Sequence, residues 1–449
     1  MRRPRVLLGF GTAAIAAVVL LFGGIFSSSD AIDPIRAAVA AARPAAAKQD
    51  ALSRLLAGLS TGDTAGYVRK LERRIAAHPQ DADALTLLGL SYQQRGRETG
   101  DPAFYKLSGK ALQKASSTGG PLPLIVQGQA SLANTRHRFN DGLRLARSAI
   151  RLDPENGAAL GALGDALLNL GRYQDAFKAY DRMALLAPGV ASYTRVANAR
   201  ELLGRPTGAA EADLLALETD SQVPEHVAWT TVQLGNVYFN MGRLAEAASA
   251  YRKALVQLPR YVHAEAGLAR VEASEGRYRI AIARLRRVVG VLPIPAYVVM
   301  LGDVLHASGH EQEARREYAL VGAIERLFAA NGVRTELQTA VFDLDHDRSV
   351  TDALARARAA YASAPGIYAE DALAWGLFHA GRCEQARAHS SHVLRLGTRD
   401  ALLIFHRAMI ERCRGAASAR PWFRRALAIN PHFSLLWAPV ARKALETGR

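Results

Sequence analysis

The chain has 449 residues, two to three times the size of a usual domain, so it forms either several domains or one extended array. Hydrophobic residues make up 49% and charged residues 22%, a balance that excludes a wholly disordered chain and a polytopic membrane protein. The net charge of +16 makes nucleic acid a partner to consider, but the 57 basic residues are spread along the chain, with no dense run beyond Arg284–Arg287. We therefore interpret the charge as a dispersed, solvated surface and do not expect the protein to bind nucleic acid.

Residues 1–29 have the pattern of a signal-anchor. Val6 to Phe26 contains 21 residues without a charge, preceded by three arginines. A helix of that length spans about 31 Å, enough to cross the hydrocarbon core of a membrane. The arginines favour an N-terminus on the inside, which places residues 30–449 on the extracytoplasmic side of the cell membrane. Cleavage near Ser27–Ser29 stays open as the alternative, and it would give a secreted protein.

Residues 30–63 are rich in alanine and contain Pro34 and Pro44, so we expect a stalk or linker. A helix–turn–helix pattern follows and recurs to about residue 433. Prolines end its second helices, and Pro154 and Pro188 lie 34 residues apart. A glycine such as Gly171 ends the first helix of each unit. A repeat of this length predicts an array in which each unit packs on its neighbours.

The pattern resembles the tetratricopeptide repeat, and the resemblance is most specific over residues 157–293. It implies an all-α fold, a right-handed superhelical solenoid of about ten helix–turn–helix repeats within residues 64–446. The chain as a whole looks like exported or membrane-anchored bacterial tetratricopeptide-repeat proteins. A half-repeat helix is expected at 65–78 and a capping helix at Ser434 to Glu446. The repeats are expected to begin near residues 82, 123, 157, 191, 228, 262, 295, 334, 367 and 401.

Motifs for catalysis and metal binding are largely missing. The common hydrolase and nucleotide-binding signatures do not occur, so we expect a protein that is not an enzyme and has no cofactor. The acidic run Asp343–Asp347 resembles the start of a calcium loop, but Arg348 and Leu354 stand where that loop needs glycine and glutamate. We predict a solvated loop there. His389 and His392 are interpreted as surface or packing residues, because no third metal ligand is evident.

The two cysteines, Cys383 and Cys413, fall near the turns of adjacent repeats. Stacked helices lie about 8–10 Å apart, farther than an unstrained disulfide reaches. The sequence therefore predicts two free thiols.

Certain positions of the first helix line the concave groove in the tetratricopeptide family, where extended peptides or helices of partner proteins bind. The resemblance therefore implies partner-binding roles for a set of polar and aromatic residues, although each of them has local packing within the solenoid as its alternative. The set comprises Trp229, Asn236, Phe239, Asn240, His263, Arg270, Asp303, His306, Tyr368, Asp371, Trp375, Phe378 and His379.

These features predict a non-enzymatic scaffold or assembly factor that is tethered to the cytoplasmic membrane and binds other proteins in its groove. The alternative is a binder of cell-envelope polysaccharide, in which Trp229 and Trp375 would stack on sugar rings.

Overall fold

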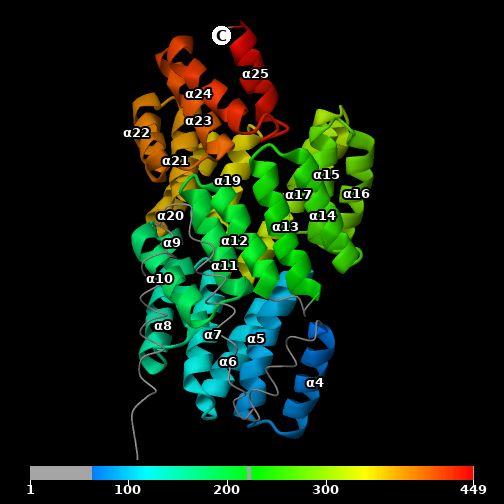
Figure 1. The fold of residues 1–449 in the computed structure, drawn as a ribbon, viewed down its shortest axis with the longest axis vertical. Helices are drawn as coiled ribbons and strands as arrows, with labels where there is room; N and C mark the ends of the chain where they lie inside the picture. Colours follow the sequence, from blue (N-terminus) through cyan, green and yellow to red (C-terminus); the bar gives the residue numbers. More distant parts are fainter. Residues whose placement is uncertain (1–62, 220–223, 448–449) are drawn as a thin grey trace, which may run out of the picture.

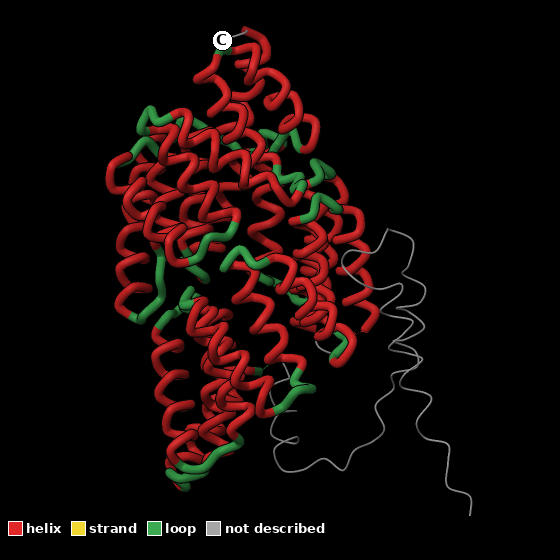
Figure 2. Tube along the Cα trace, turned by 90° about the vertical axis from the view of Figure 1, so that its left-hand side faces the viewer, coloured by secondary structure: helices red, strands yellow, loops and turns green. Residues whose placement is uncertain are grey.

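The computed structural model describes residues 63–219 and 224–447. In these ranges it contains 22 α-helices. Figure 2 shows helices joined by loops and no strand among the described residues. No helix among the described residues is both long enough and apolar enough to cross a membrane. The predicted anchor at Val6 to Phe26 and residues 30–62 of the predicted stalk lie outside the described residues.

Ten helical hairpins follow one another along the chain, and Figure 1 shows them stacked from α4 at one end to α25 at the other. Nine of the ten first helices begin within two residues of the predicted start, whereas α13 begins four residues early, at Pro224. Proline favours the first turn of a helix because its missing N–H needs no partner there. The first helices are α5 (Ala82–Thr99), α7 (Leu122–Thr135), α9 (Gly157–Asn169), α11 (Val190–Leu202), α13 (Pro224–Asn240), α15 (Val262–Ser274), α17 (Pro295–Ala307), α19 (Glu336–Asp345), α21 (Ile367–His379) and α23 (Ala401–Glu411).

The second helices pack against the first helices of the same hairpin and, apart from α18, against the helix that follows them in the array. A further helix precedes the array and another follows it, α4 (Thr64–Ala77) and α25 (Trp437–Thr447). The second helices are α6 (Ala103–Ser117), α8 (Phe139–Leu152), α10 (Tyr173–Leu186), α12 (Pro206–Thr219), α14 (Leu244–Gln257), α16 (Tyr278–Val291), α18 (Glu311–Ala330), α20 (Val350–Ser363), α22 (Cys383–Val393) and α24 (Ala416–Ile429).

At the equivalent repeat position of three hairpins, a contact between glycine and tyrosine fixes the spacing of the two helices. A Cβ added to Gly235 would lie 2.5 Å from the ring of Tyr251, so only glycine lets the ring approach this closely. The tyrosine hydroxyl then donates a hydrogen bond to a polar residue of the first helix, Asn236 in this hairpin, at 2.8 Å. The three pairs are Gly164–Tyr180, Gly235–Tyr251 and Gly302–Tyr318.

Successive coils of the superhelix contact each other directly along a seam. The Ile367 backbone N–H donates to the Tyr173 hydroxyl at 2.6 Å across 194 residues, and the Asn430 side-chain amide donates to the Phe239 carbonyl at 2.8 Å across 191 residues. The first contact joins the starts of α10 and α21, eleven helices apart, so each coil holds between five and six hairpins. A Cβ on Gly171 would lie only 2.5 Å from the Pro365 carbonyl oxygen. Glycine at this turn therefore allows the close approach of the two coils, in addition to ending its helix.

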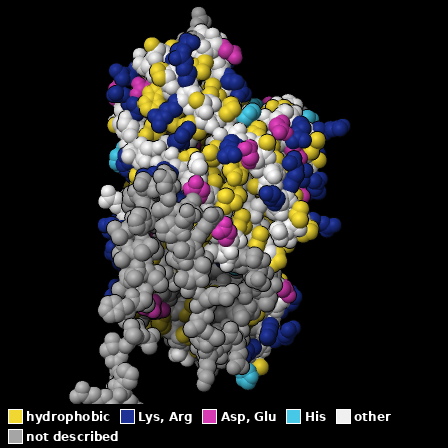
Figure 3. Space-filling view, viewed as in Figure 1, with side chains coloured by type: hydrophobic (Ala, Val, Ile, Leu, Met, Phe, Trp, Pro, Cys, Tyr) yellow, Lys and Arg dark blue, Asp and Glu magenta, His cyan; other side chains and the backbone are white. Residues whose placement is uncertain are grey.

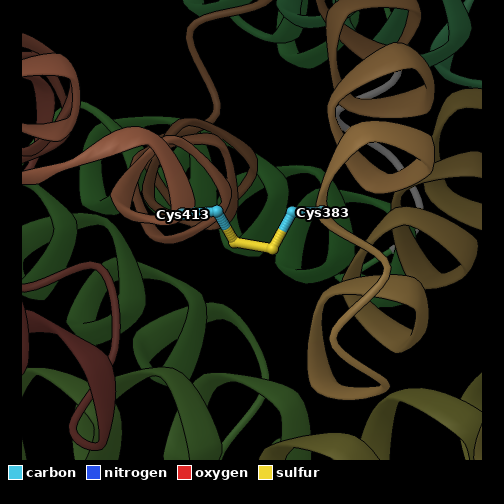
Figure 4. The surroundings of a disulfide bond; sticks show 2 residues. All are labelled: Cys383 and Cys413. Atoms are coloured by element: carbon cyan, nitrogen blue, oxygen red, sulfur yellow. A yellow bond between two sulfur atoms is a disulfide. The ribbon is translucent and has the colours of Figure 1, made fainter.

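Cys383 and Cys413 form a disulfide with their Cα atoms 6.1 Å apart, which Figure 4 shows bridging two neighbouring helical segments. The prediction of two free thiols is wrong. The spacing of about 8–10 Å applies to helix axes, whereas side chains at the facing ends of two helices come much closer. Cys383 begins α22, and Cys413 lies in a 3-10 turn directly after α23.

Candidate ligand-binding surface

Four of the predicted groove residues keep side chains open to solvent. Trp229 is partly exposed, and Asn240 and His306 are exposed. Tyr368 has 49% of its surface open, although protein surrounds it closely enough for burial to raise the pKa of its phenol. Tyr368 lines a cavity between α11–α13 and α21, α23 and α24.

Three predicted groove residues are instead buried, which corrects the expectation that they face a partner. Trp375 has no exposed surface, because α23 and α25 cover it: its ring stacks on His406 with centroids 4.2 Å apart and meets Trp437 edge-on at 5.7 Å. Phe239 is 3% exposed and Asp371 is 5% exposed. Each of these residues is part of the packing of the solenoid.

Hydrogen bonds within the solenoid engage other predicted groove residues. Asn236 accepts from Tyr251. Asp303 accepts from the Tyr318 hydroxyl at 2.8 Å and lies 2.8 Å from His346 Nε2, and the carboxylate partner raises the pKa of that imidazole against the opposing effect of burial. His306 pairs with Glu311 at 2.9 Å. Asn236 and Asp303 thus connect neighbouring helices, whereas His306 remains exposed beside Glu311.

The remaining predicted residues are partly buried. His263 Nδ1 lies 2.5 Å from the Tyr297 hydroxyl, and burial lowers the pKa of the imidazole. The Arg270 guanidinium lies 3.6 Å from the centre of the Phe239 ring, and its Nε and Nη2 atoms have no hydrogen-bond partner among the described residues. A cation over an aromatic face is stabilised by the ring even without such a partner.

Phe378 and His379 belong to the same aromatic cluster as Trp375. The Phe378 ring stacks on the Trp375 ring with centroids 5.1 Å apart. His379 meets the Trp375 ring at 4.5 Å, and burial lowers the pKa of its imidazole. Both side chains therefore support the buried tryptophan.

The acidic run at Asp343–Asp347 is not the solvated loop that we predicted, because Asp343 and Asp345 lie in the last turn of α19. Asp345 accepts hydrogen bonds from the indole N–H groups of Trp375 and Trp437 at 3.1 and 3.2 Å. Two indole donors, from α21 and α25, thus hold this carboxylate in place. In the described ranges, no group of three histidine, cysteine or acidic residues is arranged to hold a metal ion.

The histidines of α22 have a structural partner. His389 and His392 both approach the buried carboxylate of Glu370, at 3.3 and 2.8 Å between ring nitrogen and oxygen. Arg395 also donates to this carboxylate, at 3.1 Å. The interpretation of these histidines as packing residues agrees with these contacts.

A cavity of about 330 Å³ opens on the concave side between the third and fifth hairpins, where Trp229 forms part of its wall. Asp213 of α12 also lines it and is 1% exposed, yet neither carboxyl oxygen has a hydrogen-bond partner among the described residues. Burial, with a smaller contribution from the charge of Glu201, raises the pKa of Asp213 to about 8. The carboxyl group is therefore largely protonated at neutral pH.

Our reading of the sequence missed Asp213, although a signal for it exists. Tyr180, Tyr251 and Tyr318 each lie seven residues after the start of their second helix, and Asp213 lies seven residues after the start of α12. The first helix of the same hairpin has Ala197 where its counterparts α9 and α17 have glycine. A short acid in the place of a large ring leaves the space that the cavity occupies.

A larger cavity of about 730 Å³ lies where the two coils meet, between α11–α13 on one side and α21, α23 and α24 on the other. Glu201, Asn240, Tyr368 and Asp400 all line it. Burial raises the pKa of both carboxyl groups, and each pKa is raised further by a nearby acid, which is Asp400 in the case of Glu201. The Asn240 amide donates to Glu201 at 3.2 Å. The cavity is thus lined by four polar side chains, two from each coil.

The outer surface differs from these cavities. Figure 3 shows basic side chains dispersed over the visible parts of the helices at both the C-terminal end and the α15–α16 side. Basic side chains thus lie on the visible outer surface, whereas the Asp213 carboxyl group is buried without a partner among the described residues.

Family models described as tetratricopeptide repeat match residues 128–191, 232–261 and 266–326. The chain is a tetratricopeptide-repeat protein. The matched residues include the hairpins in which the glycine–tyrosine contact is present, and the described helices form the paired arrangement of tetratricopeptide repeats throughout.

Three solved structures are among those to which the chain is similar. The MamA protein is 20% identical with a TM-score of 0.29, covering 38% of this chain and 91% of its own. A thermophilic tetratricopeptide protein of Thermus thermophilus is 19% identical with a TM-score of 0.38, covering 42% of this chain and 98% of its own. A chain of the APC/C Cut9–Hcn1 hetero-tetramer is 13% identical with a TM-score of 0.34, covering 90% of this chain and 97% of its own. No curated protein matches the chain.

Proposed function

We propose that this tetratricopeptide-repeat protein is a non-enzymatic scaffold that binds a partner protein along its concave interior. The observation that carries the proposal is that Trp229, Asn240 and Tyr368, whose side chains are at least partly open to solvent, line two cavities, one within α9–α13 and the other between the two coils. Side chains spread over several hairpins suit an extended chain, which contacts many residues weakly, better than one small substrate. Tetratricopeptide repeats in general mediate contacts between proteins.

The proposal includes a location outside the cytoplasmic membrane, with Val6 to Phe26 as the anchor or as a cleaved signal. The Cys383–Cys413 disulfide supports this location, because disulfides persist in oxidising compartments and are rare in the cytosol. The test is protease accessibility of the repeats in intact spheroplasts together with a thiol-labelling assay without reductant. Repeats that are protected from protease and carry two free thiols would contradict the location.

The polysaccharide alternative has less support. It relied on two tryptophans as stacking surfaces for sugar rings, and Trp375 is fully buried. Trp229 and Tyr368 remain open, but they lie on different coils.

The test of the scaffold is affinity capture from cross-linked envelope extract with the wild type and with a variant carrying Trp229→Ala, Asn240→Ala and Tyr368→Ala. The matched control is Val256→Ser, since Val256 is 80% exposed on a second helix and lies away from the three mutated residues. We expect a protein that the wild type and the control capture and that the triple variant loses. Capture that is the same for all three proteins would show that the concave interior does not bind the partner.

A further inference from the structure

The fourth hairpin departs from the packing of its neighbours at the position where the tetratricopeptide tyrosine lies elsewhere in the chain. Tyr180 fills the same place in the preceding hairpin, where a Cβ on Gly164 would lie 2.2 Å from its ring. Asp213 is too short to fill that space, and the cavity of about 330 Å³ lies beside it. The departure therefore creates a void at the floor of the concave surface.

The carboxyl group in this void has no partner from the protein. Asp213 is 1% exposed, and both of its oxygens lack a hydrogen bond among the described residues. A buried polar group without a partner destabilises a fold, so such groups are nearly always satisfied by protein, water or ligand. The neighbouring Arg195 does not supply the missing bond, because its Nε and Nη2 atoms bind Asp165 at 2.8 and 2.7 Å.

The walls of the cavity favour a cation. Arg195 and Asp165 compensate each other's charge, which leaves Asp213 and Glu201 as two acids without a paired base. Trp229 adds an aromatic side chain to the wall. Two adjacent free oxygens on one carboxylate match the parallel N–H groups of a guanidinium, and a guanidinium also stacks on aromatic rings.

We propose that this cavity binds an arginine side chain from an extended segment of the partner protein, with Asp213 as the bidentate acceptor, Glu201 as the second negative charge and Trp229 as the ring beside the guanidinium. The inference rests on the proposed function and names the chemistry of the partner at one point of the same surface. It explains why a buried acid replaces the repeat's tyrosine beside this cavity.

Binding is coupled to release of a proton. The pKa of Asp213 is about 8 in the free protein, so at pH 6.5 the carboxyl group must lose its proton when the guanidinium arrives. Arginine keeps its charge throughout this range. The association constant is therefore expected to rise close to tenfold per pH unit between about pH 6 and 7.5 and to level off above pH 8.

Other groups that face the cavity from the packed helices are few. They are Glu201 and Arg195 of α11, Asp165 of α9 and Tyr180 of α10, whereas α13 contributes Trp229 and Gln233, which do not titrate. Burial raises the pKa of Glu201 and, to well above 10, that of Tyr180. Glu201 is therefore the neighbouring carboxyl group with a raised pKa whose titration the experiment must separate from that of Asp213.

The experiment uses isothermal titration calorimetry of the full chain with the blocked pentapeptide acetyl-Ala-Ala-Arg-Ala-Ala-amide, in two buffers of different ionisation enthalpy. Citrulline in place of the arginine gives a neutral peptide of the same shape. Lysine gives a charged peptide that lacks the two parallel N–H groups of the guanidinium. We expect the arginine peptide to bind at least tenfold more tightly than the citrulline peptide, more tightly than the lysine peptide, and with release of about one proton at pH 6.5.

Two variants test the protein side. Asp213→Asn keeps the shape of the side chain and is expected to abolish most of the proton release and to weaken binding at least tenfold. Ala197→Gly combined with Asp213→Tyr restores the glycine–tyrosine pair of the neighbouring hairpins, so it is expected to fold with a raised melting temperature and to bind no peptide. Together they separate loss of the site from loss of the fold.

Several results would overturn the inference: equal binding of the arginine and citrulline peptides, equal or tighter binding of the lysine peptide, or unchanged arginine binding by Asp213→Asn. Its failure is distinguishable from failure of the scaffold function. If the triple variant of the concave surface loses the captured protein while Asp213→Asn retains it, the scaffold function stands and the arginine site is wrong.

Discussion

The regions around Trp229 and Trp375 lie on first helices of the same repeat type, yet their tryptophans have opposite roles. Trp229 is partly exposed beside a cavity that contains an unpartnered acid. Trp375 is enclosed by α23 and α25, and the disulfide between Cys383 and Cys413 ties its hairpin to the next. The contrast teaches that the repeat supplies a common frame, while the side chains of adjoining helices decide whether a position becomes core or remains available to a ligand.

The largest expected effect on stability comes from replacing each of the two tryptophans by alanine. Trp375→Ala should lower the free energy of unfolding by about 3–5 kcal/mol, because it empties a fully buried site. Trp229→Ala should lower it by about 1 kcal/mol or less, because its ring is already partly in solvent. Urea denaturation followed by circular dichroism measures both. Equal losses would show that the two regions do not differ as described.

The second prediction concerns the removal of the disulfide that links the Trp375 hairpin to the next hairpin. Loss of the disulfide in the double variant Cys383→Ser and Cys413→Ser should lower the stability of that region by about 3–4 kcal/mol, given the 30-residue separation. Hydrogen exchange of α21–α24 measures the effect locally, and α9–α13 serve as the internal control. Unchanged exchange in α21–α24 would mean that packing alone holds these helices.

The third prediction concerns the Trp229 region and the protonation of Asp213. Its pKa is about 8 in the folded protein and about 3.9 in an unfolded chain, so between these values the folded state holds more protons. The stabilising effect of the protonated carboxyl group is thus fully present below about pH 4 and is lost as the pH rises through 8, by at most about 1.4 kcal/mol per pH unit.

Asp213→Asn cannot lose a proton, so its stability relative to the wild type should increase over this pH range. Urea denaturation of both proteins between pH 5 and 8 provides the measurement. If the free energies of unfolding of the two proteins differ by a constant amount across this pH range, the raised pKa of Asp213 is contradicted.

The smallest effect concerns the seam that joins the coil of Trp229 to the coil of Trp375. Tyr173→Phe removes the acceptor for the Ile367 N–H and should cost about 1 kcal/mol. Hydrogen exchange at Ile367 should become faster. Tyr180→Phe is the matched control, because it removes a hydrogen bond within one hairpin, to Asp165, and should leave Ile367 unchanged. Faster exchange at Ile367 in both variants would mean that the effect is not specific to the seam.

The sequence by itself determined the repeat family, the all-α fold and the starts of nine of the ten first helices to within two residues. These features depend on local chemistry: apolar periodicity selects helices, glycine ends the first helix of a hairpin, and proline stops the second. Such signals depend on only a few neighbouring residues, so they can be recognised in the sequence.

Only the tertiary structure decided which positions of the concave face remain open. The burial of Trp375 depends on His406 and Trp437, which lie 31 and 62 residues further along the chain. The disulfide depends on how closely two helix ends approach, and the seam joins residues 191 and 194 positions apart. The burial of Asp213 could be inferred from the sequence only by comparing the same position in several second helices. An acidic residue on a helix is otherwise expected to be solvated, unless its position within the repeat is known. Packing between distant segments sets these outcomes, since burial and charge compensation depend on neighbours in space rather than in sequence.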